Sequence, residues 1–280
     1  MQIITQTQIN AYEHCPRFYY LKYVRKLDWP VEIPSRDSIR RGSDFHLYIR
    51  QLLTGFRRDM LPVPDDDERM STWLEHFCQA RPLKDYVQVF AEKEVSALYT
   101  DVLWLGKFDA LGIKGDRLTI FDWKTGEKKP EPSLYRQTPQ TRLYRFLAKV
   151  CAPRLLGTGL HGLPAENIEM VYWFPEYPDQ AIALRYSETE FAEDRTWLKL
   201  KSREMGSADE SVYPRTEKSR NCIHCEYNTW CHSGSDADWG EEPEFPENDP
   251  AGDLTDEDIY QEGFFFPDIS EDTDREEKSF

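Results

Sequence analysis

The sequence predicts a mixed α/β fold over residues 1–231, followed by a disordered acidic tail over residues 232–280. Two observations predict the fold. Apolar residues at helical spacing alternate with runs of strand character, and a two-residue turn at Gly115-Asp116 joins two of those runs. A third observation separates the tail, which carries 18 of the 51 acidic residues and only 2 of the 35 basic ones, and so holds the whole net charge of −16. That composition buries too little apolar surface to fold alone.

The length and hydropathy exclude some classes of protein. A chain of 280 residues suffices for one large domain or two small ones with a real core. A mean hydropathy of −0.72, without an apolar run near 18 residues, excludes a membrane span. The first ten residues lack the basic-then-apolar pattern of a secretory signal, so we expect a cytoplasmic protein.

Four helices are expected before the first strand. Thr5 and Gln8 form a capping box, and Pro16 suits the first position of the next helix. Ser35 can cap a long helix that carries an apolar stripe. The expected helices begin at residues 5, 16, 35 and 70, and all but the second have expected ends, at about residues 14, 58 and 79.

Strands are expected next. Counting outward from a hairpin turn at Gly115-Asp116 places Asp109 directly opposite Asp122. The same register places Lys107 opposite Lys124. Both faces of the hairpin are largely apolar, as in a sheet that is covered on both sides. The expected strands lie within residues 86–99, 102–113, 117–123, 168–174 and 181–186.

Two later helices complete the body. One lies within residues 133–150, where Pro139 either opens the helix with Thr138 as its cap or kinks it. The other covers residues 188–205, and a loop then leads to a cysteine cluster.

Asp109, Asp122 and Lys124 are candidates for chemistry. Opposed side chains of such a strand pair have Cβ atoms roughly 5 Å apart, so two carboxylates there require a shared proton or a divalent cation. Lys124 follows Asp122 by two residues and therefore projects from the same face. We predict that these three side chains converge at one end of the sheet. The alternative is a strand end with ordinary solvated charges.

Four motifs occur in a fixed order. They are Gly42-x3-His46 on a helix, Gly106-x2-Asp109, Asp122-Trp123-Lys124 and Gln140-x3-Tyr144. The set resembles the RecB-like branch of the PD-(D/E)XK nucleases over roughly residues 5–231. The resemblance implies a restriction-endonuclease-like mixed sheet flanked by helices. It also implies a metal-dependent DNA nuclease, expected to be an exonuclease on single-stranded ends, in CRISPR adaptation or DNA repair.

The resemblance also implies roles for single residues. The implied ligands of Mg²⁺ or Mn²⁺ are His46, Asp109, Asp122 and the carbonyl of Trp123. Lys124 would orient or deprotonate the attacking water and stabilise the charged phosphate, while the metal acts as a Lewis acid. Gln140 and Tyr144 share a helix face and would position the DNA strand, although alone they would be an ordinary surface pair. Glu94, in the preceding strand, is either a supporting acid or a surface charge.

The cysteines suggest a second site. Cys222-x2-Cys225-x5-Cys231 supplies three thiolates, and Cys15 is the candidate for a fourth. By chemistry alone, four thiolates fit zinc or an iron–sulfur cluster, and nearby histidines (14, 224 and 232) keep zinc possible. The resemblance to iron–sulfur exonucleases of the RecB-like branch, including the CRISPR-associated kind, favours a [4Fe–4S] cluster. It would tie the N-terminal helix to the C-terminal end of the body.

The charge of the body is compatible with a DNA partner. Residues 36–58 carry a net charge of +4 and residues 114–149 one of +5. The candidate phosphate contacts are Arg40, Arg41, Lys128, Lys129, Arg136, Arg142 and Arg145. The candidates for stacking on unpaired bases are Tyr12, Phe18, Tyr19 and Tyr20, with helix packing as their alternative role.

The tail either keeps the chain soluble, mimics nucleic acid or docks a protein partner through residues 264–266.

Two other functions stay open. One is a non-catalytic iron–sulfur scaffold that binds DNA or serves as a nuclease subunit. The other is a zinc-stabilised platform that recruits proteins through the tail. The intact set of two aspartates and a lysine favours the enzyme over both.

Overall fold

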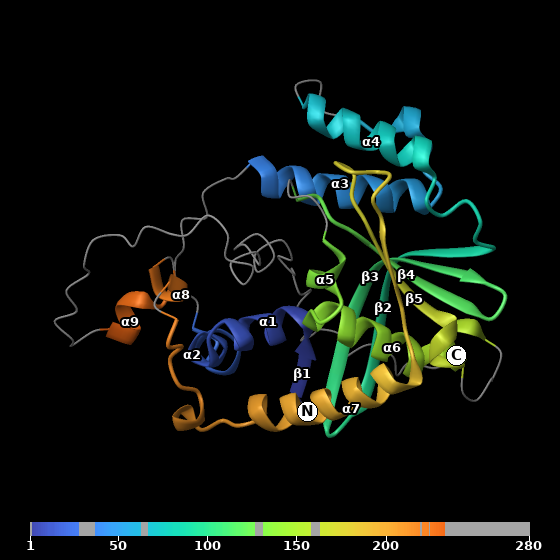
Figure 1. Cartoon of the computed structure of the whole chain (residues 1–280). Coiled ribbons are helices and arrows are strands. Elements are labelled where there is room, and N and C mark those ends of the chain that lie inside the picture. The colour runs from blue at the N-terminus through green and yellow to red at the C-terminus, as the bar shows by residue number, and fades with distance from the viewer. Residues whose placement is uncertain are drawn as a thin grey trace, which may run out of the picture. The chain divides into compact units, whose positions relative to one another are not determined.

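The computed structural model describes residues 2–27, 37–62, 67–126, 131–157, 163–218, 220–223 and 225–232. All of them belong to one compact unit, residues 1–242 (Figure 1). The strands are β1 (Gln2–Thr5), β2 (Gln88–Tyr99), β3 (Val102–Lys114), β4 (Arg117–Trp123), β5 (Ile168–Trp173) and β6 (Ile182–Arg185). The longer helices are α1 (Gln6–His14), α3 (Asp37–Leu53), α4 (Glu68–Ala80), α6 (Pro139–Leu156) and α7 (Glu188–Met205). The shorter ones are α2 (Pro16–Tyr19), η1 (Tyr20–Val24), η2 (Arg58–Met60), α5 (Pro132–Tyr135), η3 (Ala165–Asn167), η4 (Glu210–Val212), α8 (Arg220–Ile223) and α9 (Asn228–His232).

The strands of the described chain form one mixed sheet in the order β1-β3-β4-β5-β6, with β2 beside β3. The pairs β1–β3 and β4–β5 are parallel, and the other pairs are antiparallel. The predicted mixed α/β class is therefore confirmed.

β3 has different neighbours at its two ends. Its first residues pair with β1, ending with Thr5 opposite Leu105, and its last residues pair with β4, starting with Ala110 opposite Phe121. β2 runs along the other edge of β3 over its whole length. Between the two ladders, residues 106–109 pair with no described strand on this edge. Since β1 and β4 both point their carboxyl ends at this gap, we call it the fork of the sheet.

Helices cover both faces of the sheet (Figure 1). On one face, α3 and α4 pack Phe45 and Trp73 against Trp123 and Trp173 of the strands. On the other face, α6 contributes residues such as Leu147 to a core that also takes in α1 and α7. The predicted sheet with two covered faces is confirmed, and it explains why the strands read as almost continuous apolar runs.

The predicted hairpin register is also confirmed. Lys114 pairs with Arg117 across the Gly115-Asp116 turn, and the ladder runs in that register to Ala110 and Phe121. Gly115 has a φ of +63°, the left-handed conformation that a two-residue hairpin turn requires at this position.

Local capping explains where the main helices begin. Thr5 Oγ1 accepts a hydrogen bond from the Gln8 N–H, and Gln8 Oε1 accepts one from the Thr5 N–H, so the capping box of α1 is confirmed. Thr138 caps α6 and Pro139 is its first residue, so this proline opens the helix and does not kink it. α7 begins as predicted, with Ser187 as its cap.

Three features were not predicted. β1 is only four residues long, too short for an alternating pattern to stand out. Residues 20–24 continue α2 as a π-helix, and the segment that leads to the last cysteines contains α8 and α9.

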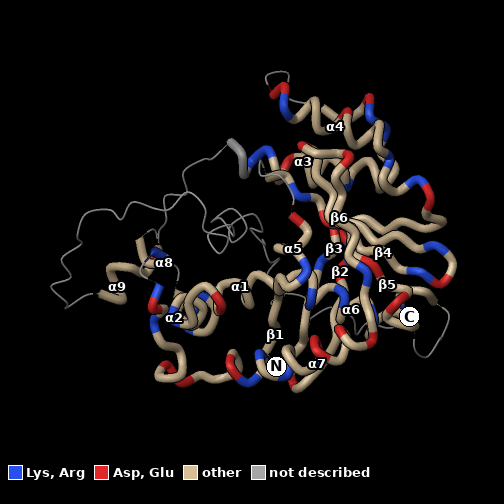
Figure 2. Tube along the Cα trace, in the orientation of Figure 1, with Lys and Arg blue, Asp and Glu red and all other residues tan. Residues whose placement is uncertain are grey.

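Charges of both signs are interspersed along the described chain (Figure 2). No helix in these parts of the chain is both long and apolar enough to cross a membrane. The expected disordered tail and its phenylalanine patch, from residue 233 onward, lie outside the described residues, as do Lys128, Lys129 and His224.

Candidate active site

Asp109 and Asp122 both lie at the fork. The ladder between their strands stops one pair earlier, at Ala110 and Phe121. In place of a backbone hydrogen bond, Oδ2 of Asp109 accepts one from the backbone N–H of Trp123 at 2.7 Å. The Asp109 carboxylate thus ends the hairpin ladder. The two acids are brought together as predicted, but they do not form the expected backbone pair.

Gln140 joins Asp122 to Lys124. Its Nε2 donates to Oδ1 of Asp122 at 2.5 Å, and its Oε1 accepts from Nζ of Lys124 at 3.0 Å. Nζ of Lys124 also lies 3.0 Å from Oδ2 of Asp122, which closes a triangle of three side chains. Because Gln140 is in the first turn of α6, the start of that helix fixes the geometry of the acid and the lysine.

Tyr172 supports this triangle from β5, and sequence reasoning missed it. It sits beside Asp122 in the parallel β4–β5 register and is completely buried. Its hydroxyl lies 2.7 Å from Thr141 Oγ1 and donates to Gln140 Oε1 at 3.4 Å. The Lys124 ammonium lies 5.5 Å from the centre of its ring, within the range of a cation–π contact. No sequence signal marked Tyr172, because its place follows only from the pairing of β4 with β5.

His46 reaches the fork from α3. Its Nδ1 lies 3.3 Å from Oδ1 of Asp109. Burial alone would lower the pKa of His46, but the charge and hydrogen bond of Asp109 outweigh it and raise the pKa to about 9. The imidazole is therefore held in its protonated form beside Asp109. The sequence prediction that His46 joins the two acids agrees with this placement.

The two carboxyl groups have opposite pKa shifts. Burial opposes ionisation of Asp109, yet His46, the Trp123 N–H and Lys124 together hold its pKa below the ordinary value. For Asp122, burial and the nearby charge of Asp109 raise the pKa against the opposing effect of Lys124. Two buried acids of this kind favour an added positive charge between them.

The side chains at the fork are of the chemical types that bind a divalent cation. They include two carboxylates and an imidazole, and Oδ2 of Asp122 is buried without a hydrogen bond of normal geometry from the described residues. Among these residues, however, no three His, Cys, Asp or Glu side chains already have the spacing of a metal centre.

Tyr144 does not reach the surface, in contrast to its expected role in positioning DNA. It is 1% exposed, and its ring centre lies 5.0 Å from that of Phe108. A Cβ at Gly106 would meet Tyr144 Cε1 at 3.1 Å and Leu147 Cδ1 at 2.9 Å. The glycine of the Gly106-x2-Asp109 motif therefore makes room for α6 against β3, and Tyr144 is a packing residue.

Two predicted phosphate contacts are wrong. Arg145 is 1% exposed and pairs with Glu190 at 3.1 Å and Asp194 at 3.9 Å. Arg142 pairs with Asp194 at 2.6 Å and lies over the ring of Trp197. Both arginines join α6 to α7, so their positive charges are paired with acids of the protein itself.

Most of the predicted stacking aromatics are also wrong. Phe18, Tyr19 and Tyr20 are all nearly fully buried in the main core. Tyr12 is partly buried and packs edge-on against Tyr19 and Tyr213. The alternative interpretation, helix packing, holds for this segment.

Glu92 stands next to the site, although no motif marked it. The β2–β3 register places it opposite Asp109, and this position is left out of the ladder. Its φ of +45° is a left-handed conformation that a residue with a side chain rarely adopts in a strand. Its carboxylate pairs with Arg50 at 3.1 Å and with Lys107 at 2.8 Å. Lys107 therefore faces β2, and the prediction that it faces Lys124 is wrong.

The four candidate cysteines lie around one small cavity of about 20 Å³. Cys15, Cys222, Cys225 and Cys231 line it together with Phe18 and Tyr227, and none of these cysteines forms a disulfide. Burial raises the pKa of Cys222 and Cys231, and that of Cys225 to about 11. The sequence prediction that Cys15 joins the C-terminal three agrees with this arrangement. The described thiols do not themselves have the spacing of a metal centre.

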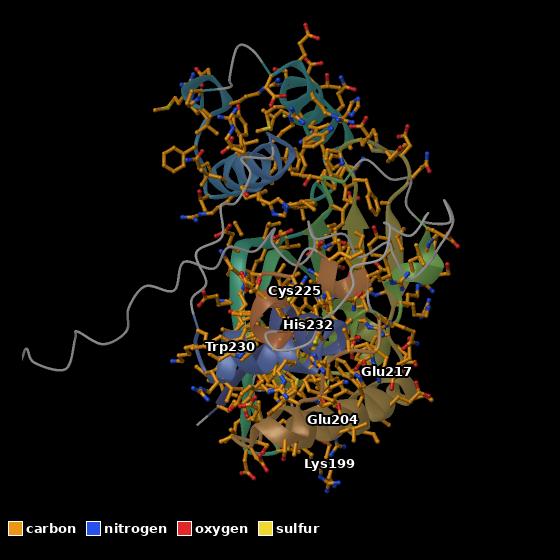
Figure 3. The ribbon with its side chains drawn as sticks, turned by 90° about the vertical axis from the view of Figure 1, so that its left-hand side faces the viewer. Lys199, Glu204, Glu217, Cys225, Trp230 and His232 are labelled. Carbon is orange, nitrogen blue, oxygen red and sulfur yellow. The ribbon has the colours of Figure 1, made fainter. Side chains whose placement is uncertain are left out.

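Polar contacts tie the same two ends of the body together. Asn221 Nδ2 donates to the His14 carbonyl at 2.7 Å, and Tyr227 donates to the Leu27 carbonyl at 2.5 Å. Within the C-terminal segment, Arg215 donates to the Cys231 carbonyl at 2.8 Å. Figure 3 labels Cys225, Trp230 and His232 on this C-terminal segment.

Comparison with known proteins gives a family. A sequence model described as "PD-(D/E)XK nuclease superfamily" matches residues 3–105 and 99–232. No curated protein matches the chain.

Comparison with solved structures finds matching chains as well. One is a crystal structure described as a "Putative exonuclease" from Eubacterium rectale, with a TM-score of 0.52 and 8% identity. The match covers 87% of this chain and 91% of that one. A second, the crystal structure of a protein named SSO0001, has 13% identity, covers 82% of this chain and 86% of that one, and has a TM-score of 0.31. At such identities the likeness concerns the fold alone.

Proposed function

The chain belongs to the PD-(D/E)XK nuclease superfamily, and from this premise we propose that it is a metal-dependent deoxyribonuclease that acts at the fork. Nucleases of this superfamily use divalent metals such as Mg²⁺ or Mn²⁺. One observation carries the proposal: Asp109, Asp122 and Lys124 meet at the carboxyl end of β4, with Gln140 holding the last two in one geometry.

The ligands of the cation would be His46, Asp109, Asp122 and the carbonyl of Trp123. When bound, the cation would supply a Lewis acid for the phosphate and a nucleophilic water at neutral pH. Binding would require a neutral His46, so its proton must leave for the imidazole to become a ligand.

Lys124 would act in cleavage beside the cation. Its ammonium is fixed by Gln140 Oε1 and by Asp122 Oδ2, both at 3.0 Å. A cation held in this way would stabilise the negative charge that develops on the scissile phosphate and would orient the attacking water. Gln140 would act through Asp122 and Lys124, since its own side chain is buried and both ends of its amide are engaged.

The test uses an end-labelled single strand of DNA with Mn²⁺, Mg²⁺ or EDTA. We expect the wild type to cleave with metal and not with EDTA, and Asp109→Ala, Asp122→Ala and Lys124→Ala to abolish cleavage without unfolding. The matched controls are Asp116→Ala and Lys114→Ala at the exposed hairpin turn, which should retain wild-type rates. Cleavage by any of the three site variants at the wild-type rate would contradict the site. A wild type that binds DNA but never cuts it would instead favour the non-catalytic scaffold.

We also propose the finer activity, an exonuclease on single-stranded ends that serves CRISPR adaptation or DNA repair. The resemblance of the four motifs to those of the RecB-like branch supports it. An internally labelled strand, its circular form and its duplex form distinguish the possibilities. An exonuclease leaves the circle intact, and a single-strand enzyme leaves the blunt duplex intact. Cleavage of the circle would make the enzyme an endonuclease.

The cysteine cavity supports a further part of the proposal, a [4Fe–4S] cluster on Cys15, Cys222, Cys225 and Cys231. Four thiols that line one cavity without disulfides have the donor chemistry for a cluster or for zinc. The cluster would reinforce the contacts between the N-terminal helices and the C-terminal segment. Its role would be structural.

A further inference from the structure

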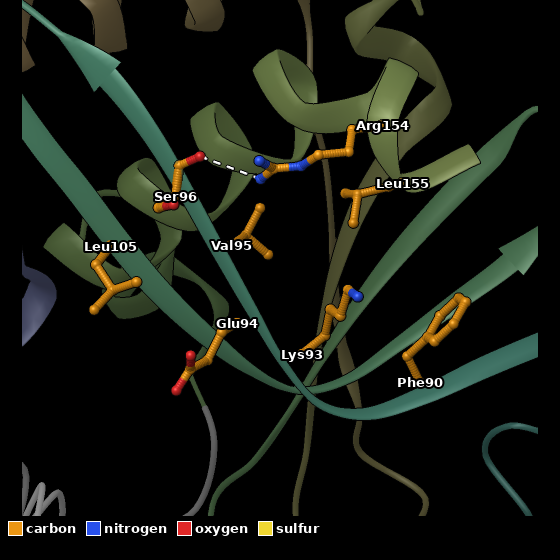
Figure 4. Close-up of a pocket in the computed structure, with 8 residues that line it drawn as sticks. All are labelled: Phe90, Lys93, Glu94, Val95, Ser96, Leu105, Arg154 and Leu155. Atoms are coloured by element: carbon orange, nitrogen blue, oxygen red, sulfur yellow. Dashed lines mark hydrogen bonds between the residues drawn. The ribbon is translucent and has the colours of Figure 1, made fainter. Parts of the chain in front are cut away.

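A second hollow lies between β2 and the C-terminal end of α6 (Figure 4). Its volume is about 520 Å³, within the range of small-molecule sites. The residues that line it are Phe90, Lys93, Glu94, Val95, Ser96, Leu105, Arg154 and Leu155. Glu94, which the sequence predicts to be either a supporting acid or a surface charge, is exposed and lines this hollow.

The hollow holds two cations without counter-ions. Neither Lys93 nor Arg154 forms an ion pair with a carboxylate of the described chain. Nearby cations do form such pairs, as Lys107 does with Glu92 at 2.8 Å and Lys149 with Glu188 at 2.7 Å. Together with the carboxylate of Glu94, these two cations give the lining a net charge of +1, and the resulting local potential attracts an anion.

Arg154 is held in place for such a ligand. Its Nη2 donates to the Ser96 carbonyl at 3.3 Å and to Cys151 Sγ at 3.6 Å. Figure 4 shows the guanidinium reaching from α6 to Ser96 on β2. Because these contacts fix the guanidinium, less side-chain entropy is lost when it binds an anion.

The rest of the lining differs in character from the two cations. Phe90 offers a partly exposed ring, with the Lys93 ammonium 5.2 Å from its centre. Val95, Leu105 and Leu155 supply apolar surface, and Glu94 supplies a carboxylate that accepts hydrogen bonds. The site therefore suits a ligand with an anionic group, a flat or apolar body and a hydrogen-bond donor.

We infer that this hollow binds a nucleotide unit, with its phosphate on Lys93 and Arg154. The base and sugar contact Phe90 and the aliphatic side chains, and Glu94 accepts a hydrogen bond from an amino or hydroxyl group. Lys93 and Glu94 lie opposite Phe108 and Lys107 of β3, so the hollow adjoins the fork from the other edge of that strand. Its far end, at Arg154, is fourteen residues or about 21 Å along α6 from Gln140. Its lining contains none of the candidate active-site residues, and its ligand class follows from that lining, independently of any cleavage.

The unit has two possible sources, a free mononucleotide or a stretch of the DNA strand itself. Both present a phosphate beside a base, so the lining alone does not separate them. The test therefore measures both ligands, in EDTA so that no strand is cut.

The experiment titrates the full-length protein with deoxyadenosine 5′-monophosphate by calorimetry, and with a labelled ten-residue oligothymidylate by anisotropy. The variants are Lys93→Glu and Arg154→Glu, with Lys114→Glu at the exposed hairpin turn as the matched control. Lys93→Glu breaks no hydrogen bond of the described chain, so it remains informative if Arg154→Glu disturbs the end of α6. Circular dichroism checks the fold of each variant.

Both charge reversals should weaken binding at least ten-fold, and the control should change it less than two-fold. Loss of the mononucleotide alone identifies a free nucleotide as the ligand, and loss of the oligonucleotide identifies the strand. Removing the phosphate, in deoxyadenosine, should also weaken binding at least ten-fold. The inference is overturned if neither ligand loses affinity in the two variants beyond the control. It is also overturned if mononucleotide binding is lost in Lys124→Ala and kept in both reversals.

Discussion

Gln140 shows how one buried amide can set the geometry of two charged groups. It donates to Asp122 and accepts from Lys124, so it must keep one orientation to satisfy both. The sequence predicted that Gln140 belongs to the site, because the motif and its helical spacing are visible. It could not predict the partners of the amide, since these depend on how α6 docks on the sheet.

We predict that Gln140→Leu lowers the cleavage rate by about 10- to 100-fold, because a lost hydrogen bond to a charged group costs about 1.5–3 kcal/mol. DNA affinity in EDTA should stay within two-fold of the wild type. The control is Gln137→Leu, three residues earlier and exposed. A loss of affinity at an unchanged cleavage rate would mean that Gln140 contacts DNA directly.

Glu92 is the residue that the motifs did not reveal. Its backbone is strained at the position opposite Asp109. Its carboxylate forms ion pairs with Arg50 and Lys107, which fix the side chain in place. Arg50 follows His46 by four residues on α3, so the two share a helix face. The Glu92–Arg50 pair thus helps to hold His46 over the fork.

We predict that Glu92→Gln raises the metal concentration needed for half-maximal cleavage by about three-fold or more, while stability falls by less than about 1 kcal/mol. The small stability effect reflects the exposure of these ion pairs. Metal titrations and thermal unfolding measure the two quantities. The exposed Glu75→Gln, on α4, is the control. An unchanged metal requirement in Glu92→Gln would show that its contacts do not position His46.

At the scale of elements, the α6–α7 contact is the clearest departure from what the sequence suggested. The sequence predicts phosphate contacts for the positive stretch around Arg142 and Arg145, yet both side chains bind acids of α7. A net charge counted along the chain does not reveal which acids a fold brings close. The ends of α7 and the hairpin register could be predicted, because a cap and a turn are local signals.

A substitution of Glu190 tests the contact between α6 and α7. We predict that Glu190→Gln lowers the free energy of unfolding at pH 7 by about 1–3 kcal/mol, because it removes a partner of the buried Arg145 while Asp194 remains. Denaturant unfolding measures the change. The exposed Glu193→Gln is the control and should stay within 0.5 kcal/mol, roughly the limit for such surface changes.

The same variant has a pH signature. Burial would raise the pKa of Glu190, but Arg145 and its other partners hold it below the ordinary 4.5. A lowered carboxyl pKa stabilises the fold above the unfolded value, and this stabilisation is lost as the pH falls through the folded value. The difference between wild type and Glu190→Gln should therefore be full at pH 7 and shrink below about pH 4. A difference that does not depend on pH would contradict the assigned ion pair.

At the scale of the whole molecule, the cysteine cavity joins residues that are about 200 positions apart in the chain. The pairing of Cys15 with the distant three could be predicted, because the spacing of the last three implied a missing fourth ligand. The hydrogen bonds that surround them could not, since these depend on side-chain placement.

We predict that anaerobically purified protein is brown, absorbs near 400 nm and loses both properties in Cys15→Ala. The melting temperature of that variant should fall by about 10 °C, because a cross-link over so long a loop is worth a few kcal/mol. Cys78→Ala, outside the cluster, is the control. Colourless wild-type protein that contains zinc would establish zinc in place of iron. An unchanged melting temperature would mean that these cysteines do not stabilise the fold.

The fork also has a consequence for how the chain folds. β2, β3 and β4 are consecutive and form local hairpins, whereas Gln2 pairs with Val102, a hundred residues further on. Contacts at such sequence separation close a long loop and form slowly. We therefore expect the hairpins to assemble first and β1 to dock late. The last strand to join would be the one that completes the fork, so a chain could hold most of its structure for some time before its two aspartates are fully enclosed.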